Sequence, residues 1–345
     1  MEQKILDYTL HALRGVLAID SPTGFTDRAA AYVSGLLTEM GYEPTFTGKG
    51  GVLCCLGGED ESNGILLSVH IDTLGAVVAQ VKGNGRLKLA PLSLCATNTE
   101  AENVLVYTRT GKTVPGTIQL INPSVHVNPD YKTAPRNFDT VECVLDEDVR
   151  SVDDVKALGI GTGCFVCPDP RTTITESGYI KSRFLDDKLS VAIVLGLAKH
   201  LKEAGITPKR QVWVHFTVYE ETGHGGSATM PDGVTEMLGI DMGCVGDGIG
   251  CTEKQVSICA KDASGPYNFE MTNRLIALAE EKGIDHAVDV YPMYSSDCST
   301  ALRTFDVKAA LIGPGVYASH GYERSHVEGV KNTFALLCAY LGIDE

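Results

Sequence analysis

The chain has 345 residues, of which 43% are hydrophobic and 21% are charged, and its formal net charge is -15. This length fits one large domain or two ordinary ones, and the composition is typical of a globular protein with a sizeable core. The acidic balance argues against nucleic acid and anionic membranes as partners. No apolar stretch reaches the roughly 18–20 residues that span a bilayer, so we expect no membrane-spanning segment.

The first seventeen or so residues predict an amphipathic helix rather than a secretion signal. Apolar residues recur at helical spacing from Ile5 to Leu17, without the continuous apolar core and cleavage site of a signal peptide. We therefore expect a cytoplasmic protein whose eleven cysteines stay reduced. Cys164 and Cys167 have zinc-ligand spacing, but no second pair of cysteines or histidines lies at a zinc-ribbon distance in the sequence.

Two helices and three strands are predicted over the first 72 residues. The first helix ends near Pro22, and Thr26 is a suitable cap for a second helix that reaches about Met40. The predicted strands cover residues 42–46, 51–56 and 65–69. The last of these is a continuous apolar run, typical of a buried strand, and it delivers His70 and Asp72 at its C-terminal end.

The pattern changes between residues 73 and 177. Helical periodicity nearly disappears, and short β-type runs alternate with Gly, Pro and Asn turns. One short helix is expected over 151–158, with Ser151 as a suitable cap. This segment therefore indicates a compact β-rich domain, inserted into an α/β domain that would comprise residues 1–72 and 178–345.

Strands and helices alternate again from residue 179 onwards. The predicted helices cover 188–204, 267–282 and 327–341, and the predicted strands include 212–219, 255–260 and 309–312. This alternation predicts an α/β fold with a mostly parallel sheet and helices on both faces. Ligands of such folds bind at the carboxyl ends of the strands.

The adjacent carboxylates of Glu220 and Glu221 are the most informative feature of this second half. They close an apolar strand, and ionised carboxylates are rarely buried unless they are paired or bind metal. Gly223 and the pair Gly225-Gly226 supply a bend that would let both face one site. One glutamate could then hold a metal while the other moves a proton, although a lone Glu-Glu pair is more often a solvated loop.

Further polar residues stand at or just beyond the ends of predicted apolar strands. The whole set comprises His70, Asp72, Asp186, Glu220, Glu221, Asp247 and His320. Each alone is more often structural, and Asp187 fits a helix cap. Their recurrence at one sheet edge favours a metal site, because mixed His and carboxylate ligands suit zinc, cobalt or manganese. Five ligands with one bridging carboxylate suit two metals about 3.5–4 Å apart.

Five stretches of the chain carry a resemblance to a known family. They are Ser-Val-His-Ile-Asp-Thr-Leu-Gly at 68–75, Phe-Leu-Asp-Asp-Lys at 184–188, Glu-Glu-Thr-Gly-His-Gly-Gly at 220–226, Val-Gly-Asp at 245–247 and Ser-Ser-Asp at 295–297. In order and identity they resemble the co-catalytic metallo-aminopeptidases of the tetrahedral, deblocking or glutamyl aminopeptidase family, over nearly the whole chain. The resemblance implies a zinc-peptidase-like fold whose inserted domain, here 73–177, is PDZ-like and helps to build oligomers.

The resemblance also implies two divalent metal ions per chain, with zinc as the first choice and cobalt or manganese as alternatives. The implied ligands are His70 and Asp247 for one metal each, Asp186 as the bridge, Glu221 on one of the two metals, and His320 at the second site. The assignment of Glu221 to a particular metal stays open.

Two further roles follow from the same resemblance. Glu220 would be the general base, taking a proton from the metal-bridging water as it attacks the peptide carbonyl. Asp72 would accept the other ring N–H of His70 and fix its tautomer. A cis peptide bond between Asp186 and Asp187 is also implied.

Three departures from the family pattern limit these assignments. Thr73 stands where the family usually has Glu, and Lys188 replaces the commoner Arg. Glu323 follows His320 by three residues rather than four, and His326 is a second candidate for the last ligand. We prefer His320, because only its register matches the family's last helix, and we expect His326 to have a capping or surface role.

The sequence thus predicts a dimetal aminopeptidase that removes N-terminal residues from peptides, assembled as a dimer-based homo-oligomer with a dodecamer as one form. A related metal-dependent deacylase or dipeptidase on the same fold is the alternative, which Thr73 keeps open. A glycosidase is disfavoured, because it needs two carboxylates across a sugar rather than a His-carboxylate set. A non-catalytic binding or assembly protein is disfavoured because every implied ligand is present.

Overall fold

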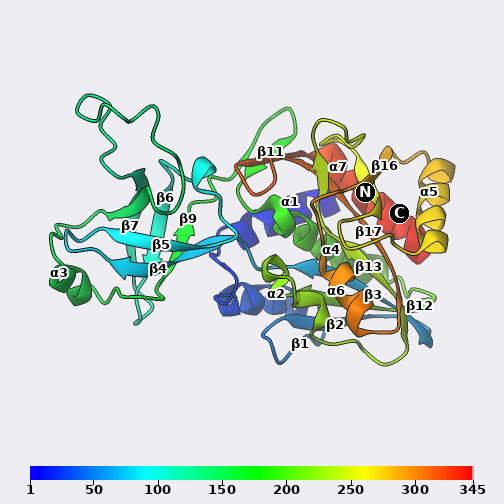
Figure 1. Cartoon of the computed structure of the whole chain (residues 1–345). Helices are drawn as coiled ribbons and strands as arrows, with labels where there is room; N and C mark the ends of the chain where they lie inside the picture. The colour runs from blue at the N-terminus through cyan, green and yellow to red at the C-terminus, as the bar shows by residue number, and fades with distance from the viewer. Residues whose placement is uncertain (344–345) are drawn as a thin grey trace. The chain divides into compact units, whose positions relative to one another are not determined.

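The computed structural model describes residues 1–343 and divides the chain into two compact units (Figure 1). Unit 1 contains residues 1–73 and the chain from residue 171 onwards, and unit 2 contains residues 74–170. The sequence placed the corresponding boundaries after residues 72 and 177.

Unit 1 is built on a 12-stranded sheet within the described residues. Its main path runs through β1 (Thr45–Phe46), β2 (Val52–Gly57), β12 (Arg210–Thr217), β3 (Asp60–His70), β13 (Val234–Ile240), β17 (Lys308–Tyr317), β18 (Glu323–His326), β11 (Tyr179–Ser182) and β10 (Thr173–Ile174). Off this path, β17 also pairs with β14 (Gly243–Val245) and β15 (Val256–Lys261), and β15 pairs with β16 (His286–Val290).

The sheet is parallel at its centre and mixed outside it. β12, β3, β13 and β17 lie side by side in one direction. The pairs β1–β2, β2–β12, β17–β18, β18–β11 and β11–β10 are antiparallel. Of the strands off the main path, β14 pairs in parallel with β17 and β16 with β15, whereas β15 is antiparallel to β17. The prediction of a mostly parallel sheet is therefore right for the four central strands but not for the sheet as a whole. Because these four strands are parallel, their carboxyl ends meet at one edge.

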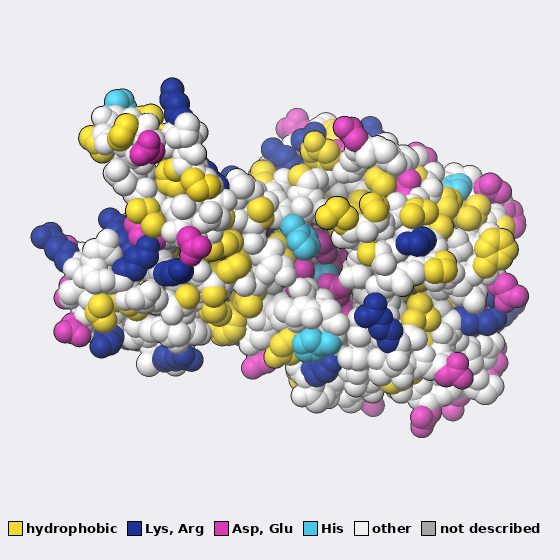
Figure 2. Space-filling model, in the orientation of Figure 1, with side chains coloured by type: hydrophobic (Ala, Val, Ile, Leu, Met, Phe, Trp, Pro, Cys, Tyr) yellow, Lys and Arg dark blue, Asp and Glu magenta, His cyan; other side chains and the backbone are white. Residues whose placement is uncertain are grey.

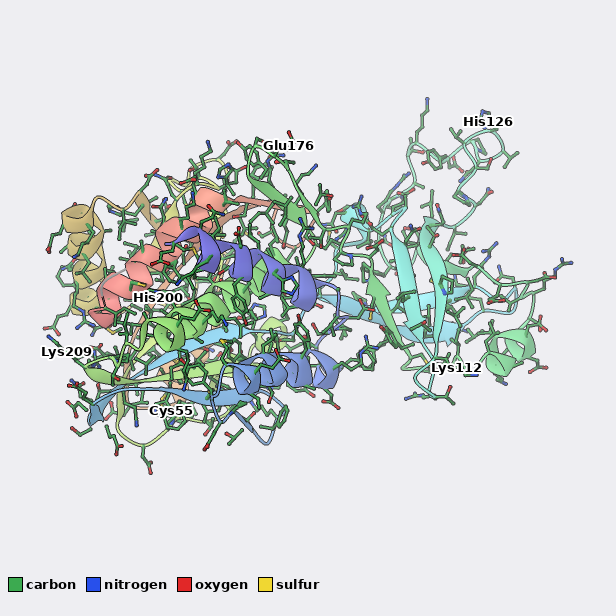
Figure 3. The ribbon with its side chains drawn as sticks, turned by 180° about the vertical axis from the view of Figure 1, so that it is seen from behind. Cys55, Lys112, His126, Glu176, His200 and Lys209 are labelled. Carbon is green, nitrogen blue, oxygen red and sulfur yellow. The ribbon has the colours of Figure 1, made fainter. Side chains whose placement is uncertain are left out.

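Helices cover both faces of the sheet, as the sequence predicts. One layer contains α1 (Gln3–Leu17), α2 (Asp27–Glu39), α4 (Leu185–Ala204), α5 (Phe269–Lys282) and α7 (Val327–Leu341). The helix α6 (Asp297–Thr304) packs on the other face, against β3, β13 and β17. Seen from behind in Figure 3, α1, α4 and α7 lie in front of the strands, whereas α6 lies in front in Figure 1.

The helix α4 lies at the centre of this helical layer and is apolar on nearly all sides. Its buried side chains run from Leu185 to Leu201, and even His200, labelled in Figure 3, is buried against Phe334. A helix that is apolar all round belongs inside a protein core. Burial of α4 therefore fixes the start of this helix, which carries Asp186, relative to the sheet.

Unit 2 is a closed six-stranded barrel, which confirms the predicted β-rich insertion. Around the barrel the order is β4 (Gly75–Val81), β5 (Leu87–Leu92), β8 (Val141–Leu145), β7 (Thr113–Leu120), β6 (Asn103–Tyr107) and β9 (Phe165–Pro168). Buried and exposed residues alternate along β7, as expected for a strand with one face on a core. The short helix α3 (Val152–Ala157) begins where predicted, and Ser151 caps it by accepting the backbone N–H of Asp154.

None of the helices in the described part of the chain combines the length and apolar character that a membrane crossing requires.

Candidate active site

Polar side chains from five separate segments converge where the parallel strands of unit 1 end. They are His70 at the end of β3, Glu220 and Glu221 after β12, Asp241 after β13, His320 after β17, and Asp186 at the start of α4. We call these six residues the acidic cluster. Figure 2 shows acidic side chains and histidines gathered in a hollow on this face of unit 1.

Asp186 lies at the centre of the acidic cluster. Its Oδ1 is 3.1 Å from Nε2 of His70, and its Oδ2 is 3.4 Å from Nε2 of His320. The two oxygens of one carboxylate therefore face two different imidazoles. This is the arrangement expected of a carboxylate that bridges two sites.

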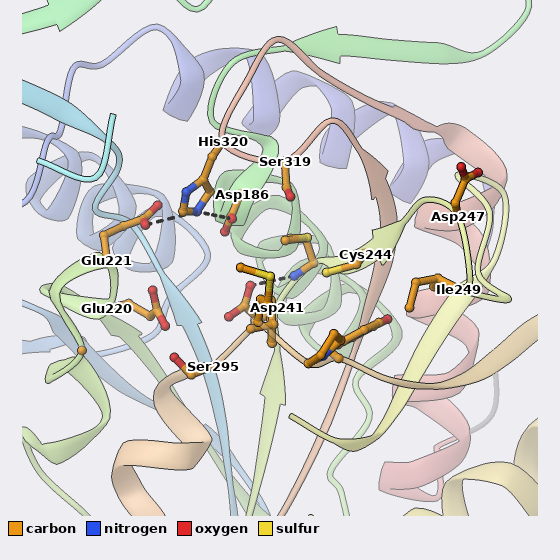
Figure 4. Close-up of a pocket in the computed structure, with 16 residues that line it drawn as sticks. Asp186, Glu220, Glu221, Asp241, Cys244, Asp247, Ile249, Ser295, Ser319 and His320 are labelled. Atoms are coloured by element: carbon orange, nitrogen blue, oxygen red, sulfur yellow. Dashed lines mark hydrogen bonds and ion pairs between the residues drawn. The ribbon is translucent and has the colours of Figure 1, made fainter. Parts of the chain in front are cut away.

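The two adjacent glutamates approach different histidines. Oε2 of Glu220 lies 3.8 Å from Nε2 of His70. Oε2 of Glu221 lies 3.5 Å from Nε2 of His320 (Figure 4). They reach one cluster because the chain bends immediately after β12, in a short 3-10 turn over Glu220–Thr222. Gly223, with φ +79°, ends this turn in a conformation that favours glycine.

The backbone beside the cluster adopts conformations that are uncommon for residues other than glycine. Phe184, Tyr219 and His320 have φ of 68°, 69° and 63°. Such left-handed residues persist where the surrounding structure fixes them, which is frequent at functional sites. The peptide bond between Asp186 and Asp187 is cis, as the resemblance implies.

Asp72 holds the glutamate turn rather than the ring of His70. Its carboxylate accepts the backbone N–H groups of Glu220 and Glu221 at 3.1 and 3.3 Å, and the hydroxyl of Thr23 at 2.7 Å. The Nδ1 of His70 lies 2.9 Å from the backbone oxygen of Asp72, but 3.7 Å from its carboxylate. The predicted contact with His70 therefore involves the main chain of Asp72, and its side chain orients the glutamates.

Glu323 binds the backbone of two cluster residues, Asp186 and His320. Its Oε2 accepts the backbone N–H of Asp186 at 3.0 Å, and its Oε1 accepts that of His320 at 2.9 Å. Burial raises the pKa of Glu323 to about 8, and the nearby charge of Asp186 adds to this effect. Glu323 thus supports the cluster although it follows His320 by three residues, where the family pattern has four.

Asp297 supports the loop after the glutamates from the other side. Its carboxylate accepts hydrogen bonds from the hydroxyl of Thr217 and from the backbone N–H of Gly226. A Cβ atom at Gly226 would lie 2.0 Å from the backbone oxygen of Asp297. Gly226 is therefore required for close approach to α6, and not for the bend that the sequence suggested.

Asp247 is not part of the acidic cluster, and the structure places Asp241 there instead. Asp241 is buried and groups with His70 and Asp187, with ligand atoms within 4.8 Å of one another. Asp247 is exposed on the loop after β14, away from Asp186 and His320 in Figure 4. Asp241 directly follows the strand β13, whose last residues are buried. A polar residue at the end of an apolar strand was the pattern that indicated His70, and the same pattern could have indicated Asp241.

The second histidine candidate, His326, lies outside the cluster. Its Nδ1 accepts the backbone N–H of Glu328 at 3.0 Å, which caps α7, and its Nε2 lies 2.9 Å from the backbone oxygen of Ser177. His320, by contrast, faces Asp186 and Glu221. The structure therefore favours the preferred histidine and gives His326 its expected capping role.

Two of the departures from the family pattern have structural roles. Lys188 is buried, and its Nζ donates to the backbone oxygen of Ile19 at 2.7 Å, which ties α4 to the segment after α1. Thr73 is also buried, and its backbone N–H donates to Ser21.

The carboxylates of the cluster are poorly compensated by positive charge. Burial raises the pKa of Glu220 and Glu221 well above the usual value, and it raises the pKa of Asp241 to about 7. Burial would also raise the pKa of Asp186, but hydrogen bonds with His320 and His70 lower it. Among the described residues, the leading influences on these four groups include no lysine or arginine.

The two histidines supply most of the balancing charge. Burial alone would lower the pKa of His70, but the hydrogen bond with Asp186 and the charge of Glu220 raise it well above 6.5. The hydrogen bond with Asp186 raises the pKa of His320 to about 9. Four carboxylates face two imidazoles, so the cluster attracts cations.

Two overlapping sets of possible metal-ligand groups lie here among the described residues. One is His70, Asp186 and Glu221, and the other is His70, Asp187 and Asp241. Neutral imidazole and carboxylate oxygen are ligands that suit zinc, manganese and related divalent ions.

Comparison with known proteins assigns the family. The sequence profile of the M42 glutamyl aminopeptidase family matches residues 50–336. The chain is 42% identical over 337 residues to the Bacillus subtilis (strain 168) protein named "Putative aminopeptidase YhfE", covering 96% of this chain and 97% of that protein. The chain belongs to the M42 glutamyl aminopeptidase family. It is accordingly a peptidase. The family that the sequence motifs indicated is therefore confirmed.

Solved structures of lower sequence identity share the fold of this M42 chain. The TET aminopeptidase from the archaeon Thaumarchaeota archaeon SCGC AB-539-E09 aligns with a TM-score of 0.87, at 18% identity over 96% of each chain. The TET1 peptidase of Pyrococcus horikoshii aligns with a TM-score of 0.85, at 19% identity, covering 98% of this chain and 100% of that one. M42 peptidases use divalent metals, and the acidic cluster provides candidate ligands for them.

Proposed function

We propose that this M42 chain is a two-metal aminopeptidase that hydrolyses the first peptide bond of peptides at the acidic cluster. The observation that carries the proposal is the Asp186 carboxylate, whose two oxygens face His70 and His320 at 3.1 and 3.4 Å. A carboxylate whose two oxygens face different histidines could bridge a pair of divalent ions, each held by one histidine.

The donor set fits two divalent ions. Asp186 would bridge them, His70 and Asp241 would complete one site, and Glu221 and His320 the other. Four buried carboxylates that face only two imidazoles in the cluster would be stabilised by cations. When bound, the ions would supply Lewis-acid polarisation of the peptide carbonyl and lower the pKa of the attacking water. Zinc is our first choice, with cobalt or manganese as alternatives.

Glu220 would move the proton. Its carboxylate belongs to the acidic cluster, with Oε2 3.8 Å from Nε2 of His70, but it is outside the proposed ligand set. Asp72 fixes its position through the backbone N–H. Glu220 would accept a proton from the attacking water and donate it to the leaving amine, as general acid–base catalysis requires.

The test compares two adjacent substitutions. Glu220→Gln should retain about two metals per chain and lose at least 10²-fold in kcat, the lower range for removal of a general base. Glu221→Gln is the matched control, because it should lose metal as well as activity. Metal content by mass spectrometry and release of N-terminal residues from peptides are the readouts. Full activity in Glu220→Gln would rule out its role as the base.

The runner-up is a metal-dependent deacylase or dipeptidase on the same fold. The panel that separates the alternatives contains dipeptides and longer peptides with free amino termini, and peptides with acylated amino termini; a dipeptidase cleaves only the dipeptides. An aminopeptidase acts only on the free amines, whereas a deacylase prefers the acylated substrates.

The barrel of unit 2 is proposed to serve assembly of a homo-oligomer. The Pyrococcus horikoshii TET1 peptidase, which shares the fold, assembles into a tetrahedron or a large octahedral shell. A dimer-based assembly, with a dodecamer as one form, is our proposal for this chain, and the PDZ-like character of the barrel stays a prediction. Sedimentation of the purified protein, with a species near twelve chains as the expected result, tests it.

A further inference from the structure

A cavity of about 560 Å³ extends from the acidic cluster along unit 1. One end carries cluster residues, including Asp186 and His320. Ile249 and Asp247 line it at a distance from them (Figure 4). This volume lies within the range of small-ligand pockets, roughly 300–1,000 Å³.

Apolar and aromatic side chains form much of the rest of the cavity wall. They include Met242, Cys244, Ile249, Tyr291 and Met293. Met293 lines the cavity and is also 95% exposed, so solvent reaches the cavity at this residue.

Among the described residues, the charged side chains that line the cavity are carboxylates, apart from His320 beside the cluster. None of the described residues that line it is a lysine or an arginine. Asp247 adds a carboxylate beyond the acidic cluster, on a loop away from the proposed metal ligands. Two divalent ions would balance the four cluster carboxylates, but they would leave Asp247 without a partner in the cavity.

We propose that this cavity receives the side chain of the substrate's N-terminal residue and selects neutral apolar side chains over acidic ones. The inference rests on the proposed aminopeptidase function and adds its specificity, which differs from the glutamyl activity in the family's description. A Leu or Met side chain would remove apolar surface from water against Ile249 and Met293. A Glu side chain would give up water next to Asp247 without gaining a cationic partner.

The experiment measures kcat/KM of the metal-loaded full chain on Leu, Met, Lys, Glu and Asp aminoacyl nitroanilides. The value for Leu or Met should exceed that for Glu by at least about 10²-fold, a ratio that pocket contacts can produce. A preference for Glu, or for Lys over both apolar residues, overturns the inference and leaves the aminopeptidase function intact.

A direct binding measurement tests the proposed preference of the cavity even if the proposed aminopeptidase activity is not found. If no substrate is cleaved, the proposed function is wrong, and calorimetric binding of free leucine and glutamate still tests the cavity. Leucine should bind more tightly than glutamate. Equal or weaker binding of leucine overturns the inference.

A charge reversal tests the role of Asp247. Asp247→Lys should raise the ratio of Glu to Leu kcat/KM by roughly tenfold, because a like charge is replaced by an opposite one. Asp232→Lys is the matched control, since Asp232 is also exposed but lies before β13, at the opposite end of that strand from the cluster. The control should leave the ratio unchanged. An equal change in both variants, or none in Asp247→Lys, contradicts the proposal.

Discussion

The carboxylate of Asp72 accepts the backbone N–H of Glu220, with Oδ1 and N 3.1 Å apart. Its other oxygen accepts the backbone N–H of Glu221 and the hydroxyl of Thr23. One buried anion therefore organises the turn that carries both glutamates. The place of the proposed base in the site depends on a residue that follows a different strand, 148 positions earlier in the chain.

Replacing this anion should impair turnover more than metal binding. In the wild type, both carboxylate oxygens of Asp72 accept backbone N–H groups of the glutamate turn. In Asp72→Asn, an NH₂ group would replace one of these oxygens and would face a backbone N–H, and two donors cannot bond to each other. We therefore expect the turn to shift. We expect kcat to fall by about 10–100-fold, the range for supporting contacts in metal sites. Metal content should stay near the wild-type value, because His70 contacts the backbone oxygen of Asp72.

The control for this prediction is Asp60→Asn. Asp60 is the exposed first residue of β3, the strand that Asp72 follows. It should leave kcat unchanged. The positioning role is wrong if Asp72→Asn keeps full kcat, or if it loses activity only in proportion to lost metal.

The two candidate aspartates after β13 should differ in metal binding. Asp241→Asn removes a buried carboxylate that groups with His70, so bound metal should fall from about two ions per chain to about one. Asp247→Asn should retain both ions, because Asp247 lies apart from the cluster. Elemental analysis after dialysis against trace metal measures both. Loss of metal from Asp247→Asn alone would restore the original assignment from sequence.

This pair of aspartates shows what the sequence can and cannot determine. Periodicity located the strands that precede His70 and Glu220, and the rule that parallel strands end at one edge brought His70, Glu220 and Glu221 together. No strand was predicted over Val234–Ile240, so Asp241 was not recognised as a residue at a strand end. Asp247, six residues further along the chain, was selected instead, and only the path of the chain through β14 shows that it lies apart from the cluster.

Supporting contacts were harder to predict than candidate ligands. Glu323 and Asp72 act through backbone N–H groups of segments more than 130 positions away. Any residue has such an N–H, so no side-chain motif marks the partner. The antiparallel margins of the sheet were missed for a related reason, since a strand as short as β18 has no periodicity to recognise.

Removal of metal should destabilise the folded chain. The cluster holds four carboxylates and two imidazoles, so binding of divalent ions stabilises the folded state relative to the unfolded one. At an ion concentration of 100 times Kd, one site contributes about 2.7 kcal/mol. Thermal denaturation with and without chelator should therefore show a lower Tm for the stripped protein, restored by zinc. The same Tm in both states would argue against metal binding at the cluster.

Glu236 provides a stability test far from the cluster. Its Oε2 contacts Arg210 on β12, Arg274 on α5 at 2.9 Å and the hydroxyl of Tyr340 on α7 at 2.8 Å. The side chain is only 13% exposed. Burial alone would raise its pKa, but hydrogen bonds with Arg210 and Tyr340 lower it below 4.5.

Glu236→Gln should lower the free energy of unfolding by about 1–3 kcal/mol at pH 7, because hydrogen bonds to a charged group are lost. A carboxylate whose folded pKa is depressed stabilises the protein above its unfolded pKa, and this stabilisation disappears as the pH falls through the folded pKa. The difference between wild type and Glu236→Gln should therefore shrink below pH 4.5. Urea denaturation at pH 7 and pH 4 measures this difference in the free energy of unfolding.

Glu270→Gln is the matched control, since the Glu270–Lys308 pair is exposed and should contribute about 0–1 kcal/mol. Equal losses in the two variants, or a difference that grows on acidification, would contradict the role of Glu236.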